Sequence, residues 1–138
     1  MSNKIYTGKC FCGFVRFEIS GPVASPCFCH CNSCRVASGA PYVAWGSFPK
    51  SSFQVIAGDL AIHKSSDPVE RGFCNRCGSS ISYFHEGRPD SIDITLVTLD
   101  EADELDELQP KFHIWIANKN PAVIIGDDLP QYDEWRIG

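Results

Sequence analysis

The sequence predicts a mainly β fold of short antiparallel strands within a single domain, residues 1–138. Strand-like segments dominate it: they are short, rich in β-branched and aromatic residues, and separated by Gly, Pro, Asn or Ser. Only two segments favour a helix, and no repeat, linker or low-complexity tract divides the chain. A chain of 138 residues buries about 68% of the surface that it exposes when unfolded, so it is expected to fold without disulfides.

The clearest strand covers residues 14–20. Val15, Phe17 and Ile19 alternate there with polar residues, which is typical of a strand with one buried face. Gly21 and Pro22 end the segment. Similar segments predict further strands around Tyr42, Val55, Ile62, Ile81, Ile94 and Trp115. Many short strands separated by turns indicate an all-β arrangement.

The two helix candidates differ in character. Residues 31–39 form the first, which Gly39 ends. The second is the acidic run at residues 100–107, which supplies six of the 17 acidic residues and is expected to be a solvated loop or a short helix. Outside this run, basic and acidic residues nearly balance, and the basic ones form no stripe. The sequence therefore argues against nucleic acid as a partner.

The N-terminus and the cysteines indicate a compartment. The first residues lack a positively charged start followed by an apolar core, and no run of about 18 apolar residues occurs. We therefore expect a soluble, cytoplasmic protein with no membrane partner. Eight cysteines at short spacings are more readily explained in a reducing compartment by metal binding or catalysis. The alternative is a secreted protein with four disulfides.

One group of cysteines has the spacing of a closed metal site. Cys10 and Cys12 form a C-x-C pair, whose side chains point to the same face. Cys74 and Cys77 form a C-x-x-C pair, and the following Gly78 lets backbone amides approach the sulfurs. Sites with four thiolates are the structural kind of zinc site. We expect one structural zinc on all four residues; a redox C-x-x-C would require a βαβ context that is not evident here.

The other group is Cys27, Cys29, Cys31 and Cys34. On a straight strand, Cys27 and Cys31 would lie roughly 13 Å apart, whereas sulfurs on one tetrahedral zinc lie about 3.8 Å apart. Cys29, Cys31 and Cys34 can converge, since Cys31 belongs to both a C-x-C pair and a C-x-x-C turn. The fourth position then stays open, as in catalytic zinc sites, unless the chain bends at Pro26 and brings Cys27 in.

The chain resembles the glutathione-dependent formaldehyde-activating enzyme family, which also includes centromere protein V. The segments "GKCFCGFVRFEI", "CHCNSCR" and "GFCNRCGSSIS", in that order and spacing, carry the resemblance, together with the closing "FHIWIANKNPAVIIGDDLPQYDEW". It implies a β-tent type fold stapled by zinc. It also implies two Zn²⁺ per chain, one structural and one catalytic, on the following residues: Cys10, Cys12, Cys74 and Cys77; Cys29, Cys31 and Cys34.

The resemblance further implies a carbon–sulfur lyase that adds a zinc-bound thiol to a small aldehyde, or the reverse. In the family, the thiol is glutathione, the aldehyde is formaldehyde and the product is S-(hydroxymethyl)glutathione. Zinc with three thiolates is a weak Lewis acid, so binding an incoming thiol as its thiolate is favoured over activating water. The alternative is a non-enzymatic two-zinc module that binds a protein, in which Cys27 closes the second site.

Other residues receive lesser expectations. His30 should point away from the cysteines on either side of it, because neighbouring side chains of an extended chain alternate. Arg35 could balance the thiolate charge, bind a substrate carboxylate or face solvent. The remaining residues are expected to serve packing, a turn or solvation rather than chemistry: Arg76, His113, Trp115, Asp127, Asp128 and Tyr132.

Overall fold

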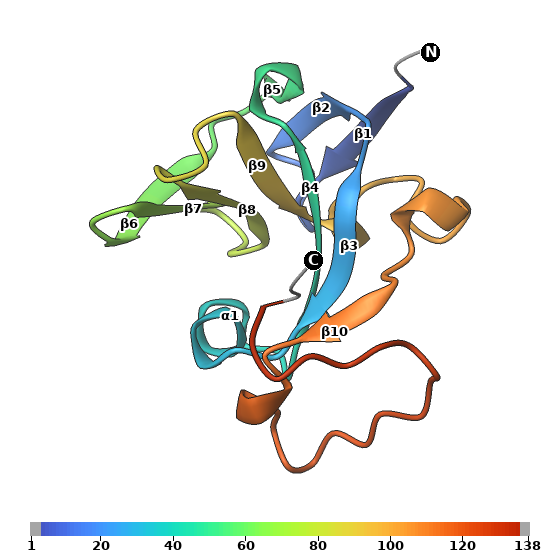
Figure 1. Cartoon of the computed structure of the whole chain (residues 1–138). Helices are drawn as coiled ribbons and strands as arrows, with labels where there is room; N and C mark the ends of the chain where they lie inside the picture. The colour runs from blue at the N-terminus through green and yellow to red at the C-terminus, as the bar shows by residue number, and fades with distance from the viewer. Residues whose placement is uncertain (1–3, 136–138) are drawn as a thin grey trace.

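A computed structural model describes residues 4–135, and it has ten strands and one α-helix (Figure 1). The mainly β fold is therefore confirmed. One sheet has the order β1-β2-β5, and the other has the order β10-β3-β4-β9-β8-β7-β6. The elements are β1 (Ile5–Lys9), β2 (Arg16–Ser20), β3 (Ala24–Cys29), α1 (Asn32–Ser38), β4 (Val43–Pro49), η1 (Lys50–Ser52), β5 (Gln54–Ala57), β6 (Ala61–Ser66), β7 (Val69–Phe73), β8 (Ser80–His85), β9 (Ser91–Thr95), η2 (Leu96–Thr98), η3 (Asp106–Leu108), β10 (Phe112–Ile114) and η4 (Ile116–Asn118).

Each strand expected around a named residue forms, and three further strands do so without an evident signal in the sequence. These are β1, β3 and β7. β3 contains Pro26, which disfavours a strand because it cannot donate a ladder hydrogen bond. The register between β3 and β4 shifts between Ala24 and Cys27, and Pro26 falls within this irregularity. Pairing with the neighbouring strands β4 and β10 therefore accounts for the formation of β3, and local sequence preference does not.

The expectation of antiparallel pairing is wrong at one place. β10 pairs with β3 in parallel, with Phe112 opposite Cys27 and Ile114 opposite Cys29. About 80 residues separate these strands, and a parallel pair needs such a long connection. The pair brings the C-terminal part of the chain beside the segment that carries the second group of cysteines.

The main core lies between the two sheets. Phe17 and Ile19 of β2, Phe48 of β4 and Ile94 of β9 are among its most deeply buried large side chains, each at most 2% exposed. These side chains sit at alternate positions of their strands, as the period of a strand requires. A separate cluster holds Trp45 together with Cys27, Cys29, Cys34, Val43, Phe112 and Ile114. The second group of cysteines therefore belongs to a packed layer of its own.

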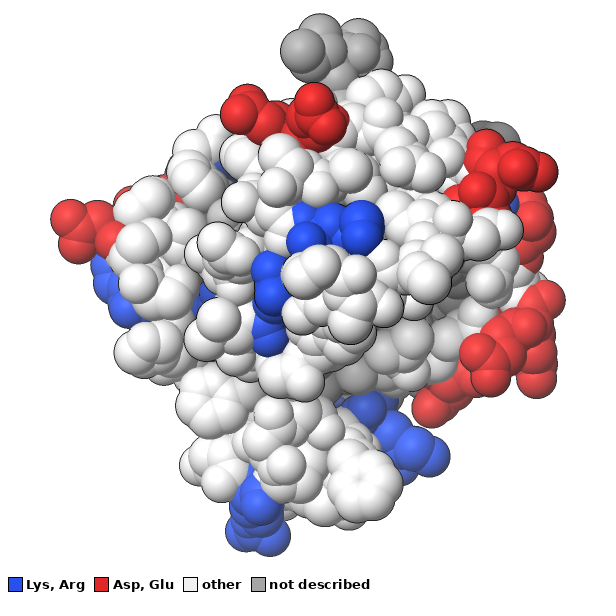
Figure 2. All heavy atoms as spheres, turned by 90° about the horizontal axis from the view of Figure 1, so that it is seen from below, with Lys and Arg blue, Asp and Glu red and all other residues white. Residues whose placement is uncertain are grey.

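The acidic run forms turns and the short helix η3. The one buried residue of η3 is Leu108, which directly follows the run. Within the run, Glu107 accepts a hydrogen bond from the Tyr6 hydroxyl at 3.0 Å. On the face seen in Figure 2, acidic side chains lie along the edges and basic ones form separate groups. Within residues 4–135, no helix is long and apolar enough to cross a membrane.

Candidate functional site: two cysteine clusters and a cavity

Four cysteines from two distant turns form the first cluster. The Sγ atoms of Cys10, Cys12, Cys74 and Cys77 all lie within 4.8 Å of one another. The Cys10 and Cys12 sulfurs are 3.6 Å apart, and those of Cys12 and Cys74 are 3.8 Å apart. Tetrahedral zinc, with Zn–S distances of about 2.3 Å, holds its sulfurs about 3.8 Å apart. The cluster therefore fits zinc, and the thiols are free rather than joined in disulfides.

The two turns that carry these cysteines have the same local design. Each has a glycine with positive φ, Gly13 at 82° and Gly78 at 83°, a conformation that residues with a Cβ avoid. Gly78 donates its N–H to the Cys74 carbonyl at 2.8 Å, and Gly13 does so to Cys10 at 3.1 Å. In each turn a later backbone N–H reaches the first sulfur, from Val15 to Cys10 at 3.3 Å and from Arg76 to Cys74 at 3.4 Å.

Hydrogen bonds from Ser79 favour the thiolate of Cys77. The Ser79 hydroxyl lies 3.3 Å from Cys77 Sγ. That hydroxyl and the Ser79 N–H lower the pKa of Cys77 to about 5. Ser79 Oγ also accepts the N–H of Phe11 at 2.9 Å, so it ties the two turns together. Cys10 and Cys74 are 1% and 0% exposed, and buried thiolates require a compensating cation.

Three cysteines form the second cluster, around the start of α1. Cys29 ends β3, Cys31 is the N-cap residue of α1, and Cys34 lies in its first turn. Their sulfurs lie within 4.8 Å of one another, and no fourth His, Cys, Asp or Glu of residues 4–135 joins the group. Cys34 donates its N–H to Cys31 Sγ at 3.3 Å, as an N-cap side chain accepts it. The donor set and spacing fit a thiophilic metal with three protein ligands.

Protonation within the second cluster is shared unequally. Hydrogen bonds from Cys29 and then Cys34 lower the pKa of Cys31 well below its usual range. Hydrogen bonds with Cys31 and then Cys34, followed by burial, raise the pKa of Cys29. One thiolate therefore forms readily, while the others need a cation before they ionise, so that metal binding would release protons.

Cys27 is not part of the group of three. It is 6% exposed, lies opposite Trp45 of β4 and Phe112 of β10, and borders the same cavity as the cluster. β3 is irregular between Ala24 and Cys27, where Ser25 has a φ of 49°, and this irregularity does not bring the Cys27 sulfur into the group of three.

The second cluster borders a cavity of about 1200 Å³. Arg71 of β7 and Arg88, just after β8, line it opposite the cysteines of β3 and α1, and Asp93 of β9 is its one acidic residue. Its aromatic lining is Trp45, Tyr83, Phe112, Trp115 and Trp135. Beside the first cluster, Cys10 borders a smaller cavity of about 330 Å³, and Cys12 is exposed at the surface. The second cluster therefore has the larger of the two cavities beside it, with room for a molecule of substrate size.

Two buried histidines, His30 and His113, and the exposed Asp127 form a chain of hydrogen bonds that starts between Cys29 and Cys31. His30 Nε2 lies 2.9 Å from His113 Nδ1, and His113 Nε2 lies 3.0 Å from Asp127 Oδ2. A carboxylate only accepts, so a neutral His113 donates from Nε2 to Asp127 and accepts from His30. This leaves His30 Nδ1 as an acceptor that, among residues 4–135, has no partner. The C-terminal segment is thus tied to the backbone between Cys29 and Cys31.

Burial sets the charge of this chain. His30 is 0% exposed, and burial, followed by the nearby His113, lowers the pKa of His30 to about 4. The hydrogen bond from His113 holds the pKa of Asp127 below its usual value. His30 points away from the cysteines on either side and is not among the grouped ligands, as the alternation of an extended chain predicts.

Several side chains have contacts that the sequence did not indicate. Arg35 donates to Asn32 Oδ1 at 3.0 Å and to the Asn118 carbonyl at 2.8 Å, so it joins α1 to η4. Arg76 was expected only to face water, but its guanidinium also lies 3.7 Å from the centre of the Phe14 ring. The cavity residues outside the cysteine motifs, Trp115 among them, had no recognisable spacing and could not be found from the sequence.

Comparison with known proteins identifies a family whose members share this region of the chain. The profile of the glutathione-dependent formaldehyde-activating enzyme family matches residues 5–118, which include both cysteine clusters. The chain belongs to this family. The resemblance seen in the three cysteine motifs is thereby confirmed.

Two curated relatives are each less than one third identical to this chain in sequence. A Halomonas elongata protein that carries the glutathione-dependent formaldehyde-activating enzyme name is 29% identical over 120 residues, which cover 81% of this chain and 75% of that protein. An uncharacterized lyase of Schizosaccharomyces pombe is 32% identical over 81 residues, 57% of this chain and 56% of that protein. A crystal structure of a Rhodobacter sphaeroides protein has the same fold, with a TM-score of 0.58 and 21% identity over 68% of this chain and 87% of that one.

Proposed function

We propose that this protein is a zinc-dependent carbon–sulfur lyase of the glutathione-dependent formaldehyde-activating type. The observation that carries the proposal is the group of three cysteine sulfurs, without a fourth ligand among residues 4–135, at the wall of a cavity of about 1200 Å³. Membership of the family supports it. Domains of this length usually fold as one unit, so the whole of residues 1–138 would form a single zinc-binding domain.

Two Zn²⁺ would be held per chain. Cys10, Cys12, Cys74 and Cys77 would hold a structural ion, and Cys29, Cys31 and Cys34 would hold a catalytic one. When bound, zinc deprotonates a coordinating thiol and so supplies a nucleophilic sulfur near neutral pH. The N–H of Cys34, which donates to Cys31, fixes one ligand of the second site in place.

The chain's own residues would bring the reactants together. The substrate thiol enters the cavity, and the aromatic side chains Trp45 and Tyr83 exclude water from its apolar part. The thiol loses its proton, and its sulfur forms a bond to the carbonyl carbon of the aldehyde as the carbon–oxygen π bond breaks. The carbonyl oxygen then takes up one proton, so that no proton is gained or lost overall. The product is a hemithioacetal, and the reverse reaction breaks the carbon–sulfur bond. Holding both reactants in one cavity raises their effective concentration.

The proposed substrates are glutathione, or a similar small thiol, and formaldehyde or another small aldehyde. This chemistry needs thiols that stay reduced, so we place the reaction in a reducing compartment such as the cytoplasm. Neither nucleic acid nor a membrane has a part in it.

Calorimetric titration of reduced glutathione into protein loaded with two zinc ions tests the proposal. We expect saturable binding that Cys31→Ser abolishes while the variant remains folded. An assay that follows loss of free formaldehyde in the presence of glutathione, relative to the uncatalysed reaction, then tests turnover. If wild-type protein with both metals binds no thiol, or turnover does not exceed the uncatalysed rate, the function is not that of a lyase of this type.

A further inference from the structure

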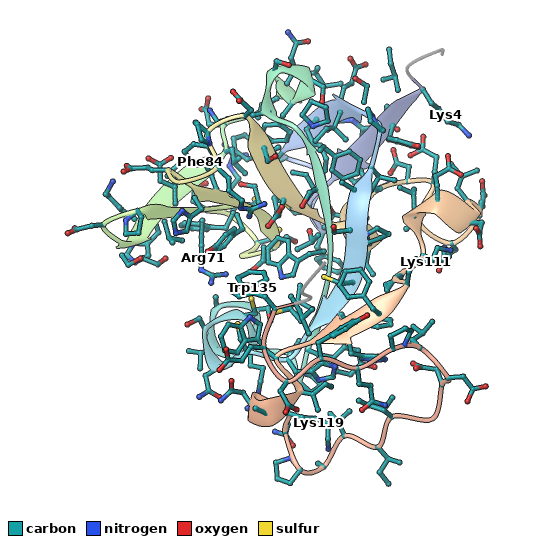
Figure 3. All side chains as sticks on the ribbon, viewed as in Figure 1. Lys4, Arg71, Phe84, Lys111, Lys119 and Trp135 are labelled. Atoms are coloured by element: carbon teal, nitrogen blue, oxygen red, sulfur yellow. The ribbon has the colours of Figure 1, made fainter. Side chains whose placement is uncertain are left out.

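Arg71 is a partly buried cation in the wall of the cavity. It lies in the middle of β7, opposite His63 of β6 and Tyr83 of β8. Its guanidinium carbon is 5.0 Å from the centre of the Tyr83 ring. Figure 3 shows Arg71 extending from the sheet into the space above α1, on the side where Trp135 lies. Stacking on Tyr83 restrains the guanidinium and leaves the N–H groups on its edge available to donate to a molecule in the cavity that Arg71 lines.

Within residues 4–135, no carboxylate pairs with Arg71. The other arginine of the cavity is engaged, because Arg88 lies 3.1 Å from Asp93, and Asp93 in turn accepts the Ser47 hydroxyl at 2.6 Å. Asp93 is also the one acidic residue of the cavity wall. Among residues 4–135, Arg71 is thus the cavity arginine that has no carboxylate partner.

We propose that Arg71 determines substrate specificity by binding the carboxylate, or another anionic group, of the thiol that enters the cavity. The inference rests on the proposed function and names the substrate class: a thiol whose apolar part meets Tyr83 and Trp45 and which ends in an anion. A guanidinium binds a carboxylate through two parallel hydrogen bonds, which fixes orientation as well as affinity. Glutathione belongs to this class, and simple neutral thiols do not.

A competing role for Arg71 makes a different prediction. Its charge also stabilises the thiolates of Cys31 and Cys34, so it could serve only to balance the negative charge of the cluster. In that case, replacing Arg71 would weaken the binding of every thiol equally. If it binds the anion of the substrate, replacement weakens anionic thiols and spares neutral ones.

The experiment uses full-length protein with both zinc ions bound and two matched pairs of thiols. N-acetylcysteine is compared with N-acetylcysteine amide, and 6-mercaptohexanoate with 6-mercaptohexanamide, so that each pair differs only in charge and two lengths are sampled. Dissociation constants are measured by calorimetry. We expect wild-type protein to prefer the carboxylate of at least one pair by about tenfold or more, as charge-assisted hydrogen bonds predict.

Three variants separate the interpretations. Arg71→Gln should abolish the preference and leave the affinity for the amides within about twofold. Arg71→Lys should keep part of it, because the charge remains while the paired geometry is lost. Arg88→Lys is the matched control, since it changes the other arginine of the cavity while a cation stays beside Asp93, and the preference should stay within about twofold of the wild-type value. Zinc content and the unfolding curve show that each variant is intact.

Two results would overturn the inference while the proposed function stands: wild-type protein binds carboxylates and amides equally, or Arg71→Gln weakens both members of a pair to the same degree. The second result would assign Arg71 to charge balance. If wild-type protein binds none of these thiols and no glutathione, the proposed function fails as well.

Discussion

The two cysteine clusters offer the same ligand chemistry, and the contrast between them lies in what surrounds them. The first joins two turns with four sulfurs and borders only a small cavity. The second has three sulfurs around the start of α1 and borders a cavity of about 1200 Å³. A closed thiolate site links distant segments, whereas one with a position to spare can accept a ligand. Ligand number and access, more than ligand type, separate a structural site from a reactive one.

Replacing one cysteine in each cluster should produce the largest difference. Cys74→Ser should lower the free energy of unfolding by on the order of 5 kcal/mol, because metal binding at a closed site contributes directly to folding. Cys31→Ser should leave a folded protein that has lost one zinc. Zinc content by mass spectrometry and unfolding in urea measure both effects. If Cys31→Ser unfolds the protein as completely as Cys74→Ser does, both sites are structural.

Chelator should empty the two sites in order. The second cluster borders a large cavity and has three protein ligands, so a chelator should remove its metal first, without unfolding. Removal of the second equivalent should coincide with loss of structure. Release of zinc and circular dichroism, followed together during titration, test this order. Simultaneous release with unfolding would contradict the difference in access.

His113→Leu tests whether the buried histidine chain supports the second cluster. It leaves the Nε2 donor of His30 without an acceptor in a fully buried place, which should cost about 1–3 kcal/mol of stability. It should also change the absorption spectrum of Co²⁺ at the second site, because the backbone between Cys29 and Cys31 loses its support.

The matched control is Asp127→Asn, whose side-chain oxygen can still accept from His113 and whose effect should be about 0.5–1 kcal/mol or less. An unchanged Co²⁺ spectrum in His113→Leu would limit the chain to a packing role.

Cys27→Ala should have the smallest effect. If three cysteines hold the second metal, this variant keeps two zinc ions and loses about 1 kcal/mol of stability from the small volume removed. Zinc content and glutathione titration check it. Loss of one zinc would make Cys27 a fourth ligand and favour the closed, non-enzymatic module.

Local patterns in the sequence determined the fold class and the ligand partition. Alternation at Val15, Phe17 and Ile19 indicated a half-buried strand, because a side-chain period of two is a property of the strand itself. The reach of an extended chain predicted that Cys27 and Cys31 lie too far apart to share one ion, and Cys27 is not in the group that Cys31 forms with Cys29 and Cys34. Gly78 was expected to let backbone amides approach the sulfurs, and it has a φ of 83°, a conformation that glycine adopts without steric strain.

Tertiary structure decided what depends on contacts between distant segments. The strand that contains Pro26 forms because β4 and β10 pair with it. This pairing outweighs the low preference of proline for a strand. The pairing of His30 with His113 spans 83 residues, and the cavity takes Arg71, Tyr83 and Trp115 from separate elements. No spacing in the sequence predicts that these side chains lie close together, because their proximity depends on loop lengths and on the order of strands in the sheet rather than on periodicity. The sequence alone therefore predicted two candidate metal sites, and only the fold placed one of them beside a cavity that holds Arg71, an arginine with no carboxylate partner among residues 4–135.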